Sequence, residues 1–543
     1  MKIVLRNGPK SVRQVQTIDS IRENCLVAVF ATVFVCVPWF LLTWRYGFDM
    51  ADEGYYWYGS QRILQGELPM RDFYSYDIGR YYWSAFFMRL LGDDGVFGAR
   101  ASAALFQVGG AFVGVYICLM SLRQRGVVRW IFAVLIASVL TVWVWPYYKV
   151  FDHFTSVLVV AALVLMLKSI RPSAWFFAGA VIGVAAIMGR NHGVYGMVAA
   201  LLVISLLLIK APSSRTVVGL FGYYLLGVLI GFSPTLIMMI AVDGFANAFI
   251  DSIVMLFQYG ATNIGLPVPW PWEVKLGGMG VMLTAAKVSV GFGFVMLLAF
   301  PLLGVLAMTY RRFDLSNDSQ KVFVAALAGA IPYAHYAFSR ADEAHLALGI
   351  FPVLVGLLSL GGSMNGLRPL QVGIALLATS LLTIGSSQPY LSALLFKTKF
   401  VQADVGGQQL WLSRGTSKLL QFATEAISHQ STGSNNFLAV PNMTSLYAIY
   451  RTKMPIWEIY SLIPRNGKFE GREIERLELI LPDLVLISDH ALDGNPLFKY
   501  SQMRPRINEW ITSGYQLTDT GENLGISDVR VYSLKKSLNK SAE

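Results

Sequence analysis

Charged residues are scarce in this chain. They make up 14% of its 543 residues, whereas hydrophobic residues make up 55%, and the mean hydropathy is +0.52. A composition this poor in charge excludes an ordinary soluble protein and predicts a polytopic membrane protein. The net charge of +11 does not indicate a nucleic-acid partner, because most basic residues lie in short loops between apolar runs.

Cysteine is nearly absent, and several catalytic motifs are missing. Cys25, Cys36 and Cys118 all lie in apolar runs, which leaves none for a disulfide in an exported region. The chain has no glycine-rich phosphate loop with GlyLys, no HisGluxxHis and no CysxxCys. The first apolar run has no small-residue cleavage pattern, so we expect it to span the membrane rather than to act as a signal peptide.

Apolar runs of spanning length recur between Cys25 and Ser387. We predict about eleven transmembrane helices, at residues 25–44, 97–119, 130–146, 154–167, 174–189, 193–209, 216–241, 288–309, 322–338, 346–361 and 369–386. Basic residues fill the alternate loops, which predicts that these loops and the N-terminus face the cytoplasm. They are Lys2, Arg6, Lys10, Arg13, Arg22, Arg123, Arg125, Arg129, Lys168, Arg171, Lys210, Arg215, Arg311, Arg312, Lys321 and Arg368.

The chain changes character after about residue 387. Residues 1–387 are predicted to form the transmembrane domain, with a first external loop at 45–96, and residues 388–543 a small extracytoplasmic α/β domain. In the second part charge rises and long apolar runs stop. Strands are predicted at 437–440, 484–487 and 529–532, with a helix at 472–480.

Five polar clusters fall on the predicted external side. They are the loop around Asp52-Glu53, residues 149–153, residues 190–192, the loop from Asp243 to about Lys287, and residues 340–345. Charges near hydrocarbon are costly and usually functional. We therefore expect these five turns to converge on an outward-facing site.

The first external loop is the most informative of these clusters. It reads DEGYYWYGSQRILQGELPMRDFYSYDIGRYYW from Asp52 to Trp83. Asp52 could cap a helix ending near Gln65, a role compatible with catalysis. The tyrosines and tryptophans suit a membrane interface, or a sugar-stacking surface. The arginines on this side, Arg62, Arg71, Arg80 and Arg89, could bind a phosphate or form salt bridges with Asp72, Asp77 or Asp93.

This loop resembles that of GT-C membrane glycosyltransferases. It is most similar to the bacterial protein mannosyltransferase and aminoarabinose transferase group, including lipopolysaccharide-modifying relatives. The matching pieces are Asp52-Glu53, the Gly66–Pro69 turn, and residues 71–73 and 76–82; looser similarity extends past Arg100 to about residue 361. A departure is Ile78, where a proline often precedes the glycine. The resemblance implies a GT-C-like fold in the bacterial inner membrane.

The resemblance also implies a reaction. A polyprenyl-phosphate sugar would be the donor, an extracytoplasmic lipid, glycan or protein the acceptor, and the anomeric carbon would be inverted. A carboxylate can supply the general base, so Asp52 is assigned as base, and Glu53 as the group that orients the acceptor or shares a divalent ion. The metal requirement stays open between Mg²⁺, Mn²⁺ and none. The residues assigned to donor phosphate and sugar are Arg71, Asp72, Arg80, Tyr81, Arg190, Asn191, His192, Arg340, Asp342 and His345.

Each of the later clusters has a simpler alternative. Arg190 to His192 lies between two short apolar runs, so a charge there favours a cavity-lining position over an exposed turn. Arg340 to His345 could instead be an ion-paired turn with Asp342 as a helix cap. Asp152 could likewise cap the helix it begins. The loop from Asp243 to Lys287 could form an amphipathic cover over the lipid site.

Two rival functions remain. A transporter or flippase for lipid-linked sugars also places charges at broken helices, but it should carry them near the midplane and on both faces. A membrane anchor for the C-terminal domain would leave the function to that domain, which shows no catalytic constellation. The TrpTrpAspTyrGly-type signature of oligosaccharyltransferases is absent there, which argues against transfer of a whole glycan to asparagine.

Overall fold

The computed structural model describes residues 10–210, 214–258, 264–275, 280–310, 315–396, 399–430, 436–526 and 528–535. The chain divides into two compact units. The helical unit comprises Met1–Leu42, Ala103–Ala241 and Leu256–Leu391, and the loop–sheet unit comprises Thr43–Ser102, Val242–Met255 and Ser392–Glu543. The first external loop therefore groups with the C-terminal residues, whereas the sequence analysis assigned it to the transmembrane domain.

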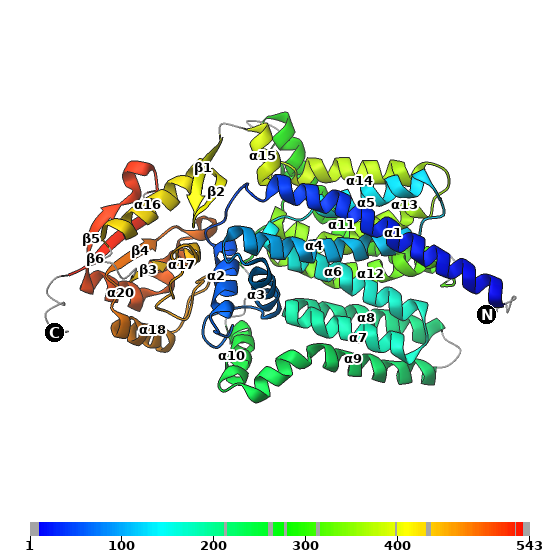
Figure 1. Ribbon diagram of the computed structural model, residues 1–543, viewed down its shortest axis with the longest axis horizontal. Helices are drawn as coiled ribbons and strands as arrows, with labels where there is room; N and C mark the ends of the chain where they lie inside the picture. Colours follow the sequence, from blue (N-terminus) through cyan, green and yellow to red (C-terminus); the bar gives the residue numbers. More distant parts are fainter. Residues whose placement is uncertain are drawn as a thin grey trace. The chain divides into compact units, whose positions relative to one another are not determined.

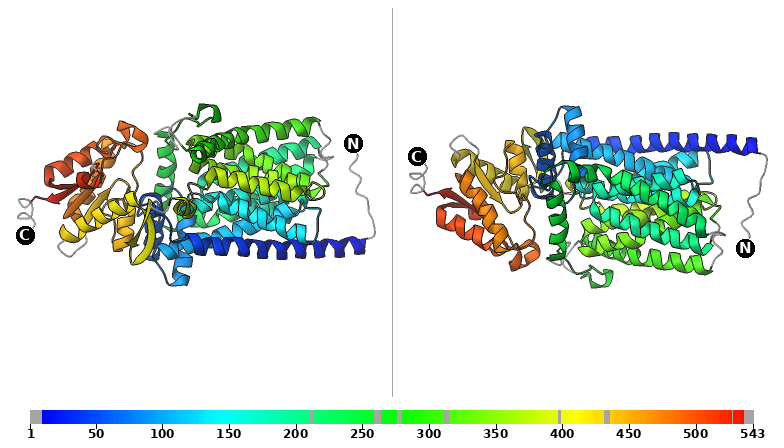
Figure 2. Two further views of the ribbon diagram at one scale, coloured as in Figure 1. Left: turned by 90° about the horizontal axis from the view of Figure 1, so that it is seen from above. Right: turned by 90° about the horizontal axis from the view of Figure 1, so that it is seen from below.

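Long apolar helices build the helical unit and run alongside one another (Figures 1 and 2). Each of the eleven predicted spans corresponds to a helix in the structure, but the helix predicted at 130–146 ends at Val142 and the one predicted at 369–386 ends at Ile384. They are α1 (Lys10–Thr43), α4 (Val96–Leu119), α5 (Val127–Val142), α6 (Val150–Lys168), α7 (Pro172–Met188), α8 (Arg190–Lys210), α9 (Ser214–Ala241), α11 (Val281–Tyr310), α12 (Asp318–Ser339), α13 (Glu343–Gly362) and α14 (Arg368–Ile384).

Length separates these helices into two groups. Among the described residues, 8 helices are long and apolar enough to cross a membrane. A ninth candidate is α14 together with α15 (Pro389–Leu395), which are bent by 79° at their break, and α5 and α7 are shorter apolar helices. The chain is therefore a multi-pass helical membrane protein with a C-terminal α/β region, as predicted.

Glycines bring α7 and α9 into close contact. A Cβ at Gly179 or Gly183 of α7 would overlap the backbone carbonyl oxygen of Tyr224 or Val228 in α9. The arrangement is reciprocal, because Gly227 and Gly231 of α9 meet the backbone of α7 in the same way. Small residues four apart allow two membrane helices to approach through their backbones, which explains how the short α7 is held.

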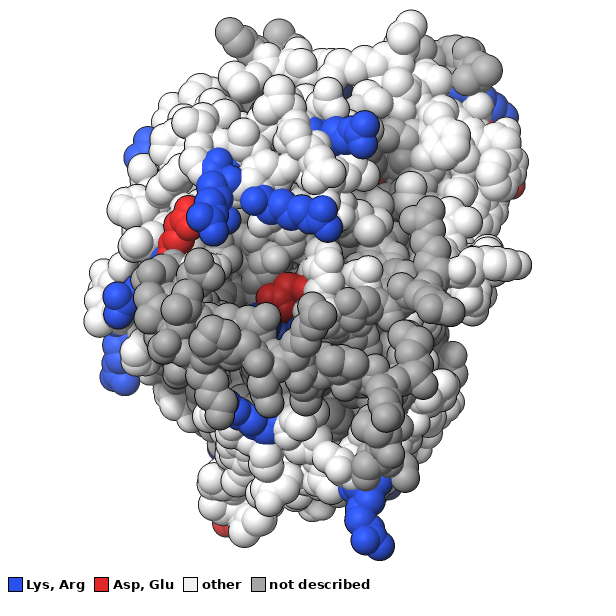
Figure 3. Space-filling model, turned by 90° about the vertical axis from the view of Figure 1, so that its right-hand side faces the viewer, with Lys and Arg blue, Asp and Glu red and all other residues white. Residues whose placement is uncertain are grey.

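Basic residues gather at one end of the helical unit. Arg129 forms an ion pair with Glu23 at 2.8 Å, and Lys168 pairs with Asp318 at 3.3 Å. These contacts bring the alternate loops together, as predicted, and Figure 3 shows Lys and Arg side chains spread over this face. Their cytoplasmic orientation stays a prediction. Lys2, Arg6, Arg311 and Arg312 lie outside the described residues, as do the side chains of Lys10, Arg13 and Lys210.

The loop–sheet unit contains the first external loop and a small α/β layer. Its helices are α2 (Asp52–Leu64), α3 (Gly79–Leu91), most of α10 (Phe245–Gln258), α16 (Arg414–Gln430), α17 (Thr444–Tyr450), α18 (Gly467–Ile480), α19 (Tyr500–Met503) and α20 (Pro505–Gly514). Single 3-10 turns occur in both units, at Tyr147–Lys149, Pro271–Glu273, Leu492–Gly494, Pro496–Phe498 and Gly521–Leu524.

Two sheets occur in this unit. A hairpin pairs β1 (Phe400–Val405) with β2 (Gln408–Ser413), and the main sheet has the order β3-β4-β6-β5. In the main sheet β3 and β4 are parallel, whereas β6 is antiparallel to both of its neighbours. The strands are β3 (Phe437–Val440), β4 (Leu484–Ser488), β6 (Val529–Leu534) and β5 (Tyr515–Thr520), with α16, α18 and α20 around them (Figure 1). The three predicted strands and the predicted helix are confirmed.

The first external loop is anchored to the C-terminal residues through its backbone. Gly47 donates to the carbonyl of Trp411 at 2.8 Å, and Trp411 donates to the carbonyl of Arg45 at 2.7 Å. Helix α2 packs against α17 where Gly54 faces Ser445, and a Cβ at Gly54 would lie 2.6 Å from the Ser445 nitrogen. The absence of a side chain at Gly54 therefore sets the distance between the two helices.

We expect Gly54→Ala to destabilise the protein by about 1–3 kcal/mol, because the added methyl group overlaps backbone that cannot move alone. Thermal unfolding of the full chain in detergent measures the effect. Gly109→Ala in α4 is the matched control, since a Cβ there meets nothing within 4 Å. Equal unfolding temperatures for the two variants would contradict this account of the α2–α17 contact.

Candidate functional site

Helix α2 begins at Asp52, but another acid caps it. The carboxylate of Asp49 accepts hydrogen bonds from the backbone N–H groups of Ala51 at 2.8 Å and Asp52 at 3.0 Å. The residue in the cap position, Ala51, has no side-chain cap. The hypothesis that Asp52 itself caps the helix is therefore wrong, because Asp49 lies where a capping carboxylate is needed.

Glu53 is buried and forms an ion pair with Arg100. The two guanidinium contacts are 2.6 Å to Oε1 and 2.8 Å to Oε2, and Glu53 is only 6% exposed. Arg100 also donates to the carbonyl oxygens of Trp44 and Gly47. A bidentate pair of this kind is strong and directional. It ties the entry of the loop to the start of α4, which gives Glu53 a structural duty.

Asp52 is half-buried and lies against a C-terminal tyrosine. Its carboxylate accepts a hydrogen bond from the hydroxyl of Tyr460, which is 8% exposed. Burial, followed by the neighbouring Asp52 charge, raises the pKa of Tyr460 well above its usual range. The phenol therefore keeps its proton and acts as a donor to the carboxylate. The ring of Tyr460 also contacts that of Tyr55, with 5.0 Å between the ring centroids.

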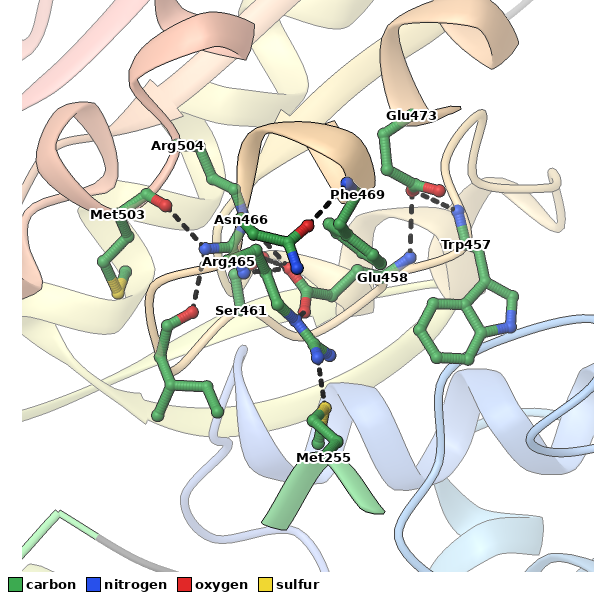
Figure 4. A network of polar contacts seen from close by, with 11 residues as sticks. Met255, Trp457, Glu458, Ser461, Arg465, Asn466, Phe469, Glu473, Met503 and Arg504 are labelled. Atoms are coloured by element: carbon green, nitrogen blue, oxygen red, sulfur yellow. Dashed lines mark hydrogen bonds and ion pairs between the residues drawn. The ribbon is translucent and has the colours of Figure 1, made fainter. Parts of the chain in front are cut away.

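A buried charge cluster surrounds Glu458, two residues before Tyr460 in the chain (Figure 4). Glu458 forms ion pairs with both Arg465 and Arg504, and all three side chains are at most 6% exposed. Ser461 donates to the same carboxylate at 2.9 Å, and Arg465 reaches the sulfur of Met255 in α10. Because a buried charge is costly without partners, these contacts fix the backbone on both sides of residue 460.

The same segment is bound to the first external loop. The carbonyl of Trp457 accepts from the N–H of Tyr74 at 2.9 Å, and its indole donates to the carbonyl of Met70 at 3.0 Å. The N–H of Met454 donates to the hydroxyl of Tyr58 at 2.9 Å. The loop that carries Asp52 and the segment that carries Tyr460 are therefore held in one arrangement.

The loop arginines pair with neighbouring carboxylates, as the salt-bridge alternative proposed. Arg80 contacts Asp77 at 2.9 Å, and Arg71 makes two contacts with Asp72 at 2.8 and 2.9 Å. Burial opposes the charge on Asp72, but hydrogen bonds from Arg71 and from the N–H of Leu68 outweigh it and lower the pKa of Asp72. The Arg71 side chain is 35% exposed and that of Arg80 only 12%. Arg71 is the more accessible of the two to an anion.

The loop tyrosines form a packed cluster instead of an open stacking surface. The ring of Tyr55 lies 6.0 Å from that of Tyr81 and 6.2 Å from that of Tyr76. Tyr81 is 1% exposed and also packs against Phe73. Burial raises the pKa of Tyr55 and of Tyr76, so both hydroxyls stay protonated. The geometry therefore gives Tyr81 a packing role, whereas the sequence analysis assigned it to the donor.

A second polar cluster lies within the helical unit. His192 contacts Asp152 at 3.1 Å through Nε2 and the Tyr333 hydroxyl at 2.7 Å through Nδ1. The hydroxyl of Tyr336 donates to the same Asp152 oxygen at 2.9 Å. Asp152 is 3% exposed and His192 is 1% exposed. Residues from α6, α8 and α12 thus share one buried hydrogen-bond network, which ties these three helices together.

The turn before α13 adjoins this network. Asp342 caps α13 by accepting from the N–H of His345 at 2.8 Å, and Arg340 contacts the other carboxylate oxygen at 2.8 Å. Burial opposes the charge on Asp342, but the hydrogen bonds of His345 outweigh it and lower the pKa of Asp342. The ring of His345 lies 6.4 Å from that of Tyr336. The ion-paired, capped turn is therefore confirmed, and it does not exclude a ligand role for Arg340.

Three of the five predicted polar clusters therefore meet within the helical unit. A fourth touches them, because Arg340 donates to the carbonyl of Ile264 at 3.2 Å. Arg190 is half-buried at the start of α8, and Asn191 beside it is exposed. Residues 259–263 and 276–279 of the loop from Asp243 to Lys287 lie outside the described residues. The acids of the first loop belong to the loop–sheet unit.

The described part of the chain contains no preformed set of metal ligands. No group of three or more His, Cys, Asp or Glu side chains there is arranged to hold an ion. Glu53, a suggested ligand, already has both carboxylate oxygens bound by Arg100. A divalent ion at this loop would therefore depend mainly on Asp52 and on the substrate's own phosphate.

Sequence reasoning missed Tyr460, Tyr333 and Tyr336. Tyr460 carries no motif, and it is 408 positions from Asp52 in the chain. A local signal existed for the other two, because Tyr333, His335 and Tyr336 interrupt an apolar run. Polar residues inside a span usually face a partner within the bundle. These three residues therefore predicted a polar network inside the helical unit.

Comparisons with known proteins give distant structural likenesses. No protein-family model matches the chain, and no curated protein matches it. The archaeal oligosaccharyltransferase AglB from Archaeoglobus fulgidus, in complex with an inhibitory peptide and a dolichol-phosphate, aligns with a TM-score of 0.46 and 10% identity, over 97% of this chain and 75% of that chain.

Two further structures of the Archaeoglobus fulgidus oligosaccharyltransferase align over 92% of this chain and 72% of theirs. The complex with Zn and sulfate has a TM-score of 0.42 and 12% identity. The enzyme tethered to an acceptor peptide containing the NVT sequon has a TM-score of 0.45 and 11% identity. Likenesses at this level do not establish a shared activity.

We expect His192→Leu to lower the stability of the protein by about 1–3 kcal/mol, because Asp152 and Tyr333 each lose a buried hydrogen-bond partner. Thermal unfolding in detergent measures this loss. Asn191→Ala changes the exposed neighbour and should shift stability by no more than about 0.5 kcal/mol. A His192→Leu variant that unfolds at the wild-type temperature would show that the network does not hold the three helices together.

Proposed function

We propose that this protein is a membrane glycosyltransferase that moves one sugar from a polyprenyl-phosphate donor to an extracytoplasmic acceptor. The observation that carries the proposal is the division between the two adjacent acids. Glu53 is buried against the charged guanidinium of Arg100, whereas Asp52 is half-buried and accepts a hydrogen bond from the neutral hydroxyl of Tyr460. The resemblance of residues 52–83 to the first loop of GT-C transferases supports the same reaction.

In the proposed reaction, Asp52 acts as the general base. The acceptor hydroxyl gives its proton to the Asp52 carboxylate while its oxygen attacks the anomeric carbon. The bond from that carbon to the phosphate oxygen breaks, and the lipid phosphate leaves with the bonding electrons. A single displacement of this kind inverts the anomeric centre.

The departing phosphate needs positive charge. Arg71 is the more exposed of the two paired loop arginines, which favours it over Arg80 as a phosphate contact. Arg190, Asn191, Arg340 and His345 are the corresponding candidates in the helical unit. His192 and Asp342 are proposed to position those groups, because both are bound within the network that surrounds them.

A divalent ion, Mg²⁺ or Mn²⁺, would screen the charge of the donor phosphate if it binds. Asp52 is the residue of the first loop that would hold it, since the Glu53 carboxylate is bound by Arg100. The proposed proton transfer to Asp52 does not require such an ion.

The rival proposal is a transporter or flippase for lipid-linked sugars. It predicts polar sites near the middle of the spans and at both faces. The buried Asp152–His192 network instead adjoins the turns before α6, α8 and α13, a distribution that supports the transferase. By the resemblance and the charge pattern, we propose a bacterial inner membrane location with the C-terminal region outside the cytoplasm.

We expect Asp52→Asn to reduce sugar transfer by at least about a hundredfold, because the acceptor loses its base. Its unfolding temperature should stay near that of the wild type, since asparagine keeps the shape and can accept from Tyr460. Transfer is measured with purified protein in detergent and a panel of polyprenyl-phosphate sugars. Genomic neighbours guide the choice of acceptors.

Glu53→Gln is the matched variant one residue away. It should unfold more easily, by about 3–5 kcal/mol, because Arg100 is left buried without a counter-charge. Its folded fraction should retain more transfer than Asp52→Asn does. Wild-type transfer by Asp52→Asn would refute the base assignment, and failure of the wild type to release lipid phosphate from any donor would refute the transferase.

A further inference from the structure

We propose that Tyr460 is a positioning residue for Asp52, so that the C-terminal region forms part of the catalytic machinery. The inference rests on the proposed function, because it concerns the base of that reaction. It assigns to the C-terminal region a duty that the sequence did not reveal, which is to orient the Asp52 carboxylate.

Tyr460 contacts both Asp52 and the helix that carries it. The hydroxyl of Tyr460 donates to Oδ1 of Asp52, and the buried phenol ring rests on Tyr55 of the same helix, α2. Tyr55 is 7% exposed and is itself enclosed by other tyrosines. The ring of Tyr460 therefore cannot move without disturbing the helix that carries Asp52. A hydrogen bond from a fixed donor restricts the rotation of a carboxylate and orients its lone pairs.

The chain just before Tyr460 is anchored by several hydrogen bonds. Trp457 is bound to the first loop through both its carbonyl and its indole, and Glu458 is bound to the C-terminal core through Arg504. Backbone N–H groups of both residues donate to the Glu473 carboxylate, at 2.8 and 3.2 Å. Tyr460 lies in the chain between these anchors and Arg465, which pairs with Glu458 (Figure 4).

The hydrogen bond from Tyr460 has a chemical consequence for the proposed base. A general base must lie within hydrogen-bond reach of the proton that it takes, in the right orientation. The bond from Tyr460 to Oδ1 sets the orientation of the Asp52 carboxylate towards the acceptor. Loss of the hydroxyl should therefore lower kcat more than it changes KM.

The test compares Tyr460→Phe with Tyr500→Phe in the full chain. The values of kcat, per folded enzyme, and of KM are measured with a polyprenyl-phosphate sugar that the wild type uses. Tyr500 is the control, because it is also a buried tyrosine of the C-terminal region and its hydroxyl has no hydrogen-bond partner among the described residues. Both substitutions remove one oxygen from a buried ring and leave the ring in place.

We expect Tyr460→Phe to lower kcat by about ten- to a hundredfold through misplacement of the base. KM should stay within about twofold of the wild-type value, because the hydroxyl orients the base and does not bind the substrates. Tyr500→Phe should leave both quantities at the wild-type values. A purely structural role for Tyr460 would lower the amount of folded enzyme and leave kcat per folded enzyme unchanged.

A second variant keeps the test valid if Tyr460→Phe folds poorly. Difluorotyrosine at position 460 retains the ring and the hydroxyl donor, so its kcat should stay near the wild-type value while that of Tyr460→Phe falls. Equal kcat values per folded enzyme for Tyr460→Phe and the wild type would overturn the proposal. If Asp52→Asn also transfers sugar at the wild-type rate, the proposed function fails instead; if only the Tyr460 variants are neutral, the inference alone fails.

Discussion

The ion pair between Glu53 and Arg100 is the constraint on which the first loop depends. Both side chains are almost completely removed from solvent, so neither charge is tolerable without the other. Arg100 also donates hydrogen bonds to the carbonyl oxygens of Trp44 and Gly47, which fixes the path of the chain into α2. The Asp49 carboxylate then caps the N-terminus of α2 by accepting from the N–H groups of Ala51 and Asp52. The Asp52 carboxylate, one residue before Glu53, has a different contact and accepts from the Tyr460 hydroxyl.

A second charge cluster holds the segment that contacts the Asp52 carboxylate through Tyr460. Glu458, Arg465 and Arg504 are buried far along the chain from Asp52, yet they hold the segment that delivers the Tyr460 hydroxyl. Buried ionic groups of this kind add little net stability compared with apolar packing. Their value here is specificity, because they allow few alternative arrangements of residues 457–466.

The sequence predicted those helices and strands that depend on local composition or on the periodicity of apolar residues. All eleven apolar runs became helices, and the strands at 437–440 and 484–487 stand where β-branched and apolar residues indicated them. The hairpin β1–β2 and the edge strand β5 were missed, since exposed polar residues alternate there with few buried ones. Among the predicted spans, α5 and α7 are shorter apolar helices that do not meet the length of a full span.

The site was predictable only in part. Asp52 and Glu53 could be identified as important, but their division of labour depends on Arg100, 47 positions away, and on Tyr460, 408 positions away. Similarly, His192 was selected as a ligand residue, whereas its partners Asp152 and Tyr333 come from other helices. Pairings between distant residues follow from tertiary packing, which a single sequence does not record.

The central claim is that this membrane protein consumes a lipid-linked sugar at its outer face. The most direct measurement uses proteoliposomes that contain the purified wild-type chain and a labelled polyprenyl-phosphate sugar, and follows both donor cleavage and donor movement between leaflets. The account predicts acceptor-dependent release of free lipid phosphate and a product with an inverted anomeric centre. Donor that changes leaflet intact, with no release of lipid phosphate, would contradict it and identify a carrier.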